Sequence, residues 1–159
     1  MKACSSLVLI AAAAAGIGIG PAQTVSGFRA VTVLPSPVIR LEAGKPVSVQ
    51  VTIQIRYGYH INSNAPAEDY LIATQLTWDP VLDLESVEYP KAETVEYAFS
   101  SKPLSVYSNR IVIRSTFRAP ETIPGSLREL SGKFRYQACN SRACFPPKTV
   151  PVTVAILPR

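Results

Sequence analysis

The sequence has few of the side chains that bind metals. Its single histidine is His60, its single methionine is Met1, and its three cysteines are Cys4, Cys139 and Cys144. A blue-copper site requires two histidines and a cysteine, and a closed structural zinc site requires four ligands. We therefore expect no metal and no cofactor. A cysteine–histidine hydrolase is also disfavoured, because His60 lies far upstream of the last two cysteines and no oxyanion hole is evident. We expect His60 to lie at the end of a loop and to bond to backbone.

The sequence also lacks clustered positive charge, and after its first residues it lacks helical spacing. The formal net charge is +5, but arginines and lysines occur singly between apolar residues, as at Arg110, Arg114 and Lys133. A surface that binds nucleic acid would group such residues. We therefore expect no nucleic-acid partner and interpret these charges as the solvated faces of strands.

The first residues have the layout of a secretory signal peptide. Lys2 precedes a continuous run of apolar and small residues, which ends at Gly20-Pro21-Ala22. A membrane anchor is disfavoured, because the run is rich in alanine and glycine and short for a hydrocarbon core of about 30 Å. We predict that residues 1–22 are cleaved and that residues 23–159 form a single exported domain. Cleavage removes Cys4 and leaves a pair of cysteines where a disulfide can form and persist.

Alternation of apolar and polar residues predicts strands along most of the remaining chain. The most regular segment is PVSVQVTIQIRY (46–57), whose valines, isoleucines and Tyr57 share one face, and the period recurs at 110–118, 130–138 and 149–157. Weaker candidates are residues 28–34, 37–42, 71–78 and 82–89. All but one of the fourteen prolines follow the predicted signal peptide, at intervals suited to loops between short strands. We therefore predict an all-β, immunoglobulin-like antiparallel β-sandwich. Pro151 indicates an edge strand or a bulge, and Trp78 is expected in the core.

Cys139 and Cys144 lie in YQACNSRACFPP, between two strand-like segments. The residues between them favour a turn, so we expect both thiols on one hairpin at the end of the sandwich, accessible to a partner. Closing so short a loop stabilises a fold by about 2 kcal/mol, against about 4 kcal/mol for a sixty-residue loop. The residues alone leave two interpretations open. One is a redox-active pair, and the other is a secreted β-sandwich binding module with a purely structural disulfide.

The segments YQACNSRACFPPKTVPV and GYHINSNAPAEDYLIATQLTW resemble the N-terminal periplasmic domain of DsbD, the thiol:disulfide interchange protein. The resemblance covers about residues 47–156. Its most specific features are the Tyr-Gln pair before the first cysteine, the short loop, and the aromatic and two prolines after the second. The resemblance implies a periplasmic immunoglobulin-like domain whose cysteine pair carries electrons without a cofactor.

The resemblance also implies partners and residue roles. A thioredoxin-like or membrane electron-transfer protein would donate electrons, and oxidised periplasmic proteins would accept them. Cys144 would form the mixed disulfide with a partner, and Cys139 would resolve it. The segment VEYAFSSKP (95–103) corresponds in order to the family's cap loop. Tyr97 and Phe99 are therefore cap candidates and Glu96 is a candidate acid, with ordinary packing as the alternative for each aromatic.

Two features of the sequence limit what is carried over from the family. DsbD proteins continue into a transmembrane region and a thioredoxin-like domain, whereas this sequence ends at Arg159, so we expect a separate subunit that takes electrons from another protein. Some family members have five residues between the cysteines, and here there are four. Within this loop, Arg142 is a candidate for favouring the thiolate through its charge, and a solvated turn residue is the alternative.

Overall fold

The computed structural model describes residues 29–157, so the predicted signal peptide at residues 1–22 lies outside the described residues. Every regular element from residue 29 to residue 157 is a β-strand. No helix in this range has the length and apolarity needed to cross a membrane.

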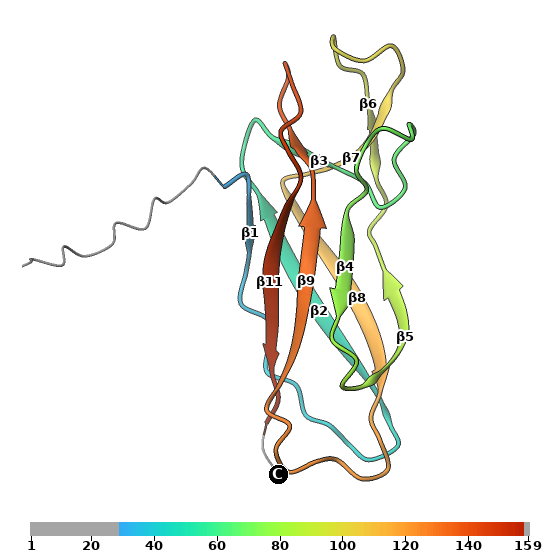
Figure 1. Cartoon of the computed structure of the whole chain (residues 1–159), viewed down its shortest axis with the longest axis vertical. Coiled ribbons are helices and arrows are strands. Elements are labelled where there is room, and N and C mark those ends of the chain that lie inside the picture. Colours follow the sequence, from blue (N-terminus) through green and yellow to red (C-terminus); the bar gives the residue numbers. More distant parts are fainter. Residues whose placement is uncertain (1–28, 158–159) are drawn as a thin grey trace, which may run out of the picture.

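Two antiparallel sheets form the layers of a sandwich (Figure 1). The first has the order β1-β2-β8-β5, with β1 at Val31–Val33, β2 at Pro46–Ile55, β8 at Arg110–Arg118 and β5 at Asp83–Glu88. The second has the order β11-β9-β4, with β11 at Lys148–Ala155, β9 at Glu129–Tyr136 and β4 at Gln75–Trp78. The predicted all-β, immunoglobulin-like antiparallel sandwich is confirmed.

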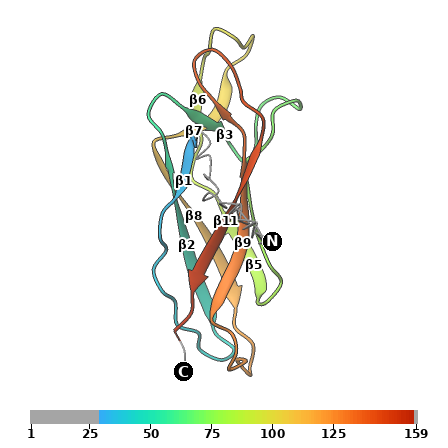
Figure 2. The same ribbon diagram turned by 60° about the vertical axis from the view of Figure 1, so that its left-hand side comes forward.

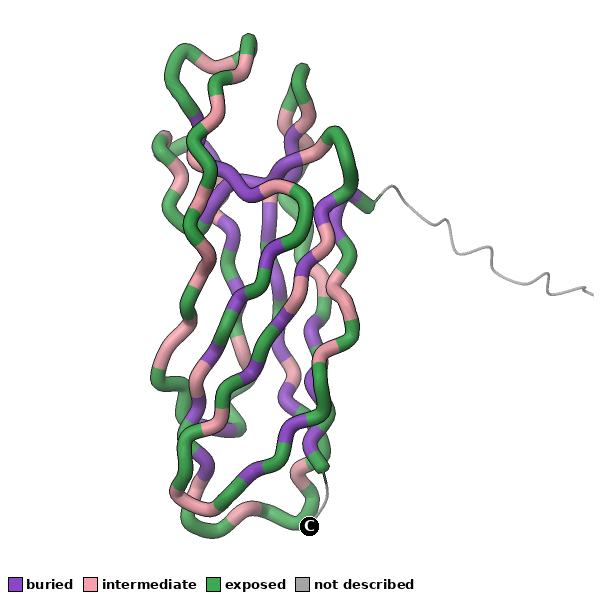
Figure 3. Tube along the Cα trace, turned by 180° about the vertical axis from the view of Figure 1, so that it is seen from behind, coloured by how far each residue is buried: buried purple, intermediate pink, exposed green. Residues whose placement is uncertain are grey.

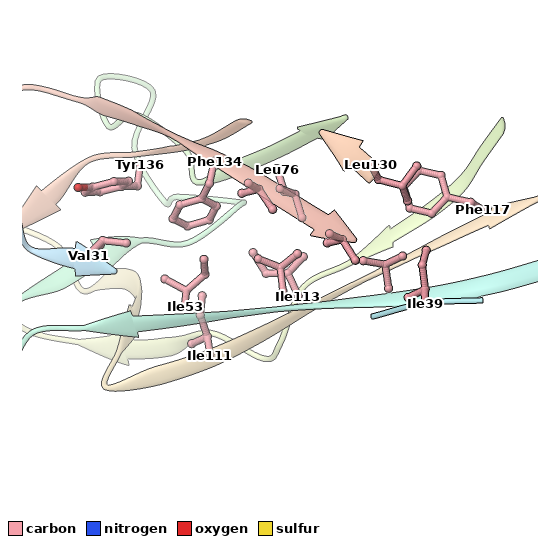
Figure 4. Close-up of a cluster of buried hydrophobic side chains, with 14 of the residues drawn as sticks. Val31, Ile39, Ile53, Leu76, Ile111, Ile113, Phe117, Leu130, Phe134 and Tyr136 are labelled. Atoms are coloured by element: carbon pink, nitrogen blue, oxygen red, sulfur yellow. The ribbon is translucent and has the colours of Figure 1, made fainter. Parts of the chain in front are cut away.

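The core lies between these two sheets. The long strands alternate buried and exposed residues, as their period of two predicts (Figure 3). Ile53 and Ile113 from the first sheet face Phe134 from the second (Figure 4). Ser115 lies on the same buried face of β8 as the apolar residues. Its hydroxyl accepts a hydrogen bond from Trp78 Nε1 at 2.9 Å, which stabilises this polar side chain in the core. Trp78 packs against this core, as expected.

Three local predictions have different outcomes. β11 is an edge strand of its sheet, so the edge position indicated by Pro151 is confirmed. Tyr57 was assigned to the buried face, which is wrong: β2 ends at Ile55 and the Tyr57 side chain is 95% exposed. Residues 37–42 contribute only an isolated bridge, between Ile39 and Ile156, rather than a strand.

A third, smaller sheet lies at one end of the sandwich. Its order is β10-β3-β7-β6, with β10 at Ala138–Cys139, β3 at His60–Asn62, β7 at Leu104–Ser108 and β6 at Glu93–Val95. β2 and β3 are separated by a turn in which Gly58 has φ of 79°, and β7 and β8 are separated by Asn109 with φ of 58°. Glycine and asparagine tolerate this left-handed conformation. These two positions allow the paired strands to change direction and begin the small sheet.

The chain also changes sheets at Gln137. β9 ends at Tyr136 in the second layer, and the next strand, β10, pairs with β3 of the small sheet. The cysteine hairpin that follows projects from the end of the molecule opposite the C-terminal end of β11, beside the β6–β7 loop (Figures 1 and 2). The fold therefore brings the hairpin, β3 and the β6–β7 loop to one end.

Candidate functional site

Cys139 and Cys144 form a disulfide within the projecting hairpin. The S–S bond is 2.02 Å long and joins residues with a sequence separation of 5, whose Cα atoms are 3.9 Å apart. The two cysteines also form an isolated antiparallel bridge. Backbone hydrogen bonds close the hairpin on both sides of them, from Phe145 N to Ala138 O at 2.8 Å and from Asn140 N to Ala143 O at 3.0 Å. The hairpin is thus held by contacts that do not involve sulfur.

The turn between the cysteines is organised by Asn140. Its Oδ1 atom accepts hydrogen bonds from the backbone N–H groups of Arg142, at 2.8 Å, and Ala143, at 3.0 Å. An asparagine that bonds the backbone two residues ahead forms an Asx turn, which is common in tight loops. Arg142 is exposed at the tip of this turn. Its position in the loop agrees with the sequence, and its effect on either sulfur remains a prediction.

The two cysteines differ in exposure. The Cys139 side chain is completely buried, with 0% exposed, whereas Cys144 is partly exposed. The expectation that a partner can reach both thiols is therefore wrong for Cys139, because β10 places it against β3 inside the small sheet. An attacking thiolate must reach the sulfur that it attacks. Of the two cysteines, only Cys144 has exposed surface.

Gln137 connects the base of the hairpin to its surroundings. Its Oε1 atom accepts hydrogen bonds from Asn62 Nδ2 at 3.0 Å and from Ile72 N at 3.1 Å, and its Nε2 atom donates to Phe145 O at 3.2 Å. One half-buried amide thus joins the hairpin to β3 and to the β3–β4 loop. The sequence motif includes this glutamine, but nothing in the spacing indicates these three partners.

His60 lies beside the disulfide. It is the register partner of Cys139, because β3 pairs with β10. Directly opposed residues of an antiparallel pair place their side chains on the same face. The expected loop-end histidine is instead the first residue of β3, buried with 3% of its surface exposed, and its Nε2 atom has no hydrogen-bond partner. Sequence reasoning did not find this pairing, since the two residues are far apart along the chain.

The predicted cap aromatics lie over His60. The Tyr97 ring stacks on the imidazole with centroids 4.2 Å apart and an interplanar angle of 17°. The Phe99 ring stacks on Tyr97 in turn, at 5.4 Å and 19°. Glu96, the candidate acid, is exposed in the same loop. The structure thus brings Tyr97 and Phe99 to the disulfide end of the molecule, where Tyr97 stacks on the residue that pairs with Cys139.

Burial determines the electrostatics of this region. It lowers the pKa of His60 from 6.5 to about 4, because the charged imidazolium loses its hydration. Burial also raises the pKa of Tyr97, and the negative charge of Glu93 raises it further. Both rings are therefore neutral near pH 7.

An apolar pocket of about 470 Å³ borders the segment of the hairpin that follows Cys144. Its wall includes Phe145, Pro146 and Pro147, which follow the partly exposed Cys144, and Tyr59, whose ring lies 6.0 Å from that of Phe145. A partner that approaches Cys144 therefore meets apolar surface next to the sulfur.

Comparison with known proteins identifies the family. The model of the family described as "Thiol:disulfide interchange protein DsbD, N-terminal" matches residues 30–156. The chain belongs to this family. Membership in the DsbD N-terminal family supports a role in thiol–disulfide interchange. No curated protein matches the chain.

Two solved structures, both of N-terminal domains, are similar to the chain. The N-terminal periplasmic domain of ScsB from Proteus mirabilis is 12% identical with a TM-score of 0.52, and the match covers 78% of this chain and 44% of that one. The reduced DsbD N-terminal domain of Neisseria meningitidis is 19% identical with a TM-score of 0.46, and the match covers 71% of this chain and 80% of that one. The ScsB match supports the sandwich fold.

Proposed function

We propose that this chain passes reducing equivalents through the Cys139–Cys144 pair. A thioredoxin-like or membrane electron-transfer protein is the donor, and oxidised proteins of the periplasm are the acceptors. The observation that carries the proposal is the unequal exposure of the two cysteines, because it supports separate tasks for them. Family membership supports the same chemistry.

In the loading step, a donor thiolate attacks Cys144 Sγ. The Cys139–Cys144 bond breaks, and its electron pair leaves on Cys139 Sγ, which takes up a proton. A second donor thiolate then attacks the donor sulfur of the mixed disulfide and releases Cys144 as a thiolate. The donor is oxidised to a disulfide, and the pair in this chain becomes a dithiol.

In the unloading step, the Cys144 thiolate attacks a disulfide of the acceptor. One acceptor sulfur leaves as a thiolate and is protonated, and the other is held in a mixed disulfide with Cys144. Cys139 then attacks Cys144 Sγ and releases the second acceptor sulfur as a thiol. The acceptor gains two electrons and two protons, so no cofactor is needed.

The rival interpretation gives the disulfide a structural role in an exported binding module. The hairpin hydrogen bonds and the short ring argue against it, because a bridge across five positions stabilises the fold by only about 2 kcal/mol. We further propose that the chain acts in the periplasm after removal of residues 1–22, and that residues 23–159 form one domain.

A trapping experiment tests the proposal. Cys139→Ser removes the resolving thiol, so its Cys144 should accumulate a mixed disulfide with an oxidised thioredoxin-like protein. Cys144→Ser is the matched control, since its remaining thiol belongs to the buried residue and should accumulate little adduct. Non-reducing electrophoresis and mass spectrometry identify the linked cysteine. Equal, negligible adduct from both variants would favour the structural disulfide.

A further inference from the structure

A row of side chains crosses the small sheet next to the disulfide. Cys139 on β10 pairs with His60 on β3, which pairs with Ser108 on β7. Because directly opposed residues share a face, these side chains are neighbours on one side of the sheet. The Ser108 hydroxyl donates to the carboxylate of Glu93 on β6, with both oxygens at 2.9 Å. The row thus runs from a buried sulfur, past an imidazole, to a carboxylate.

The disulfide form leaves one nitrogen of this row without a partner. His60 Nε2 is buried and makes no hydrogen bond. Tyr97 covers the ring by stacking on it, and such stacking offers the ring face rather than a hydrogen bond to a ring nitrogen. A buried polar atom without a partner calls for a physical explanation, because most such atoms in folded proteins are paired.

Opening the disulfide gives Cys139, the register partner of His60, a hydrogen to donate. The reduced Cys139 carries an S–H group, and its side chain is fully buried, so it cannot donate to bulk water. A neutral imidazole with its proton on Nδ1 presents Nε2 as an acceptor. We propose that His60 is a positioning and proton-accepting residue for Cys139, which binds the Cys139 thiol proton in the dithiol form and takes it during the resolving step. This inference rests on the proposed function.

The resolving step moves one proton from Cys139, through His60, to the departing acceptor sulfur. Cys139 transfers its proton to His60, and the resulting thiolate attacks Cys144 Sγ in the mixed disulfide. The new Cys139–Cys144 bond forms while the bond from Cys144 to the acceptor sulfur breaks, and the electron pair leaves on that acceptor sulfur. The imidazolium then gives its proton to the departing thiolate, which leaves as a thiol. His60 returns to the neutral, buried form.

The elements packed around His60 carry charged side chains. Glu93 on β6 reaches the row through its hydrogen bond with Ser108. Glu96 lies in the covering loop, and Arg142 lies at the exposed tip of the hairpin. Tyr97, which covers the ring, is neutral because burial raises its pKa. Burial lowers the pKa of His60, so the imidazole is neutral near pH 7 with a lone pair on one nitrogen, and it holds the thiol proton only transiently before passing it to the departing sulfur.

The test follows the resolving step with 5,5′-dithiobis(2-nitrobenzoate) as the probe. The reduced protein releases one equivalent of the coloured thiolate when Cys144 attacks, and a second when Cys139 resolves the adduct. His60→Phe keeps an aromatic ring for the Tyr97 stack but has no nitrogen. His60→Gln keeps a hydrogen-bond acceptor but has no titratable group. Both variants should slow the second phase at least tenfold at pH 7, with the first phase unchanged.

The two variants should differ at equilibrium. Loss of the Cys139 hydrogen bond in His60→Phe should lower the equilibrium constant for reduction by glutathione about tenfold, or about 30 mV for two electrons. His60→Gln should stay closer to the wild type. A second phase with the wild-type rate and pH profile in both variants would overturn the role of His60. Absence of a second phase in the wild type would instead overturn the proposed function.

A measurement on the unaltered protein keeps the inference testable even if a variant does not fold. The chain has one histidine, so its imidazole ¹⁵N signals are unambiguous. Reduction should shift the Nε2 signal toward that of a hydrogen-bonded acceptor. An Nε2 signal that is identical in the disulfide and dithiol forms would contradict the proposal.

Discussion

Acidification should destabilise the disulfide form of this protein through His60. Burial holds the folded-state pKa of His60 at about 4, whereas the unfolded-state value is 6.5. Between these values the unfolded chain binds more protons than the folded chain, so stability falls as the pH falls. From pH 7.5 to pH 4.5, this single group should lower the free energy of unfolding by about 2.5 kcal/mol. The loss is complete below pH 4.

Urea unfolding measures this effect. The single tryptophan, Trp78, packs against the core and reports the transition by fluorescence. Carboxylates also titrate near pH 4.5, so the wild type must be compared with His60→Gln, which retains every carboxylate. The difference between the two proteins in their loss of stability isolates His60. Equal losses would mean that His60 is not buried in a neutral form and would refute the reasoning.

Three further predictions concern the hairpin and its cover. Tyr97→Ala should speed reduction of the disulfide by small thiols, because Tyr97 covers the residue beside Cys139, and stopped-flow thiol assays measure the rate. Cys139→Ala combined with Cys144→Ala should lower the free energy of unfolding in urea by no more than about 2 kcal/mol, because the disulfide ring is short. Gln137→Ala should cost about 2–3 kcal/mol in the same assay, because it removes three hydrogen bonds and leaves buried groups unpaired.

Controls separate these effects from general damage. Tyr57→Ala removes an aromatic ring that is 95% exposed, so it should change neither the stability nor the rate of reduction. An equal acceleration by Tyr57→Ala and Tyr97→Ala would contradict a covering role for Tyr97. A loss well above 2 kcal/mol in the double cysteine variant would instead support the structural interpretation of the disulfide.

The long strands could be predicted from the sequence because one face of each is buried. The stripe of valine and isoleucine in β2 fixes which residues face the core, and apolar stripes of other composition do the same for β8, β9 and β11. Tyr57 continues the stripe in the sequence but not in the structure, because Gly58 begins a turn there. A period of two does not reveal where a strand ends.

The small sheet could not be predicted in the same way. All three residues of β3 are buried, so this strand has no alternation, and β10 contains only two residues. The pairing of His60 with Cys139 arises because β2 bends into β3 and β9 changes sheets at Gln137. Such a long-range register depends on tertiary structure. The motif therefore located the disulfide correctly but not its neighbour, and it did not indicate that Cys139 is buried.

The reduction potential of the Cys139–Cys144 pair tests the central claim most directly. The purified protein would be equilibrated with dithiothreitol or glutathione buffers of defined potential, and the dithiol fraction would be measured by alkylation and mass spectrometry. A pair that exchanges electrons with periplasmic partners should have a potential well above about −300 mV. A value at or below about −300 mV, the range of inert structural disulfides, would contradict the account.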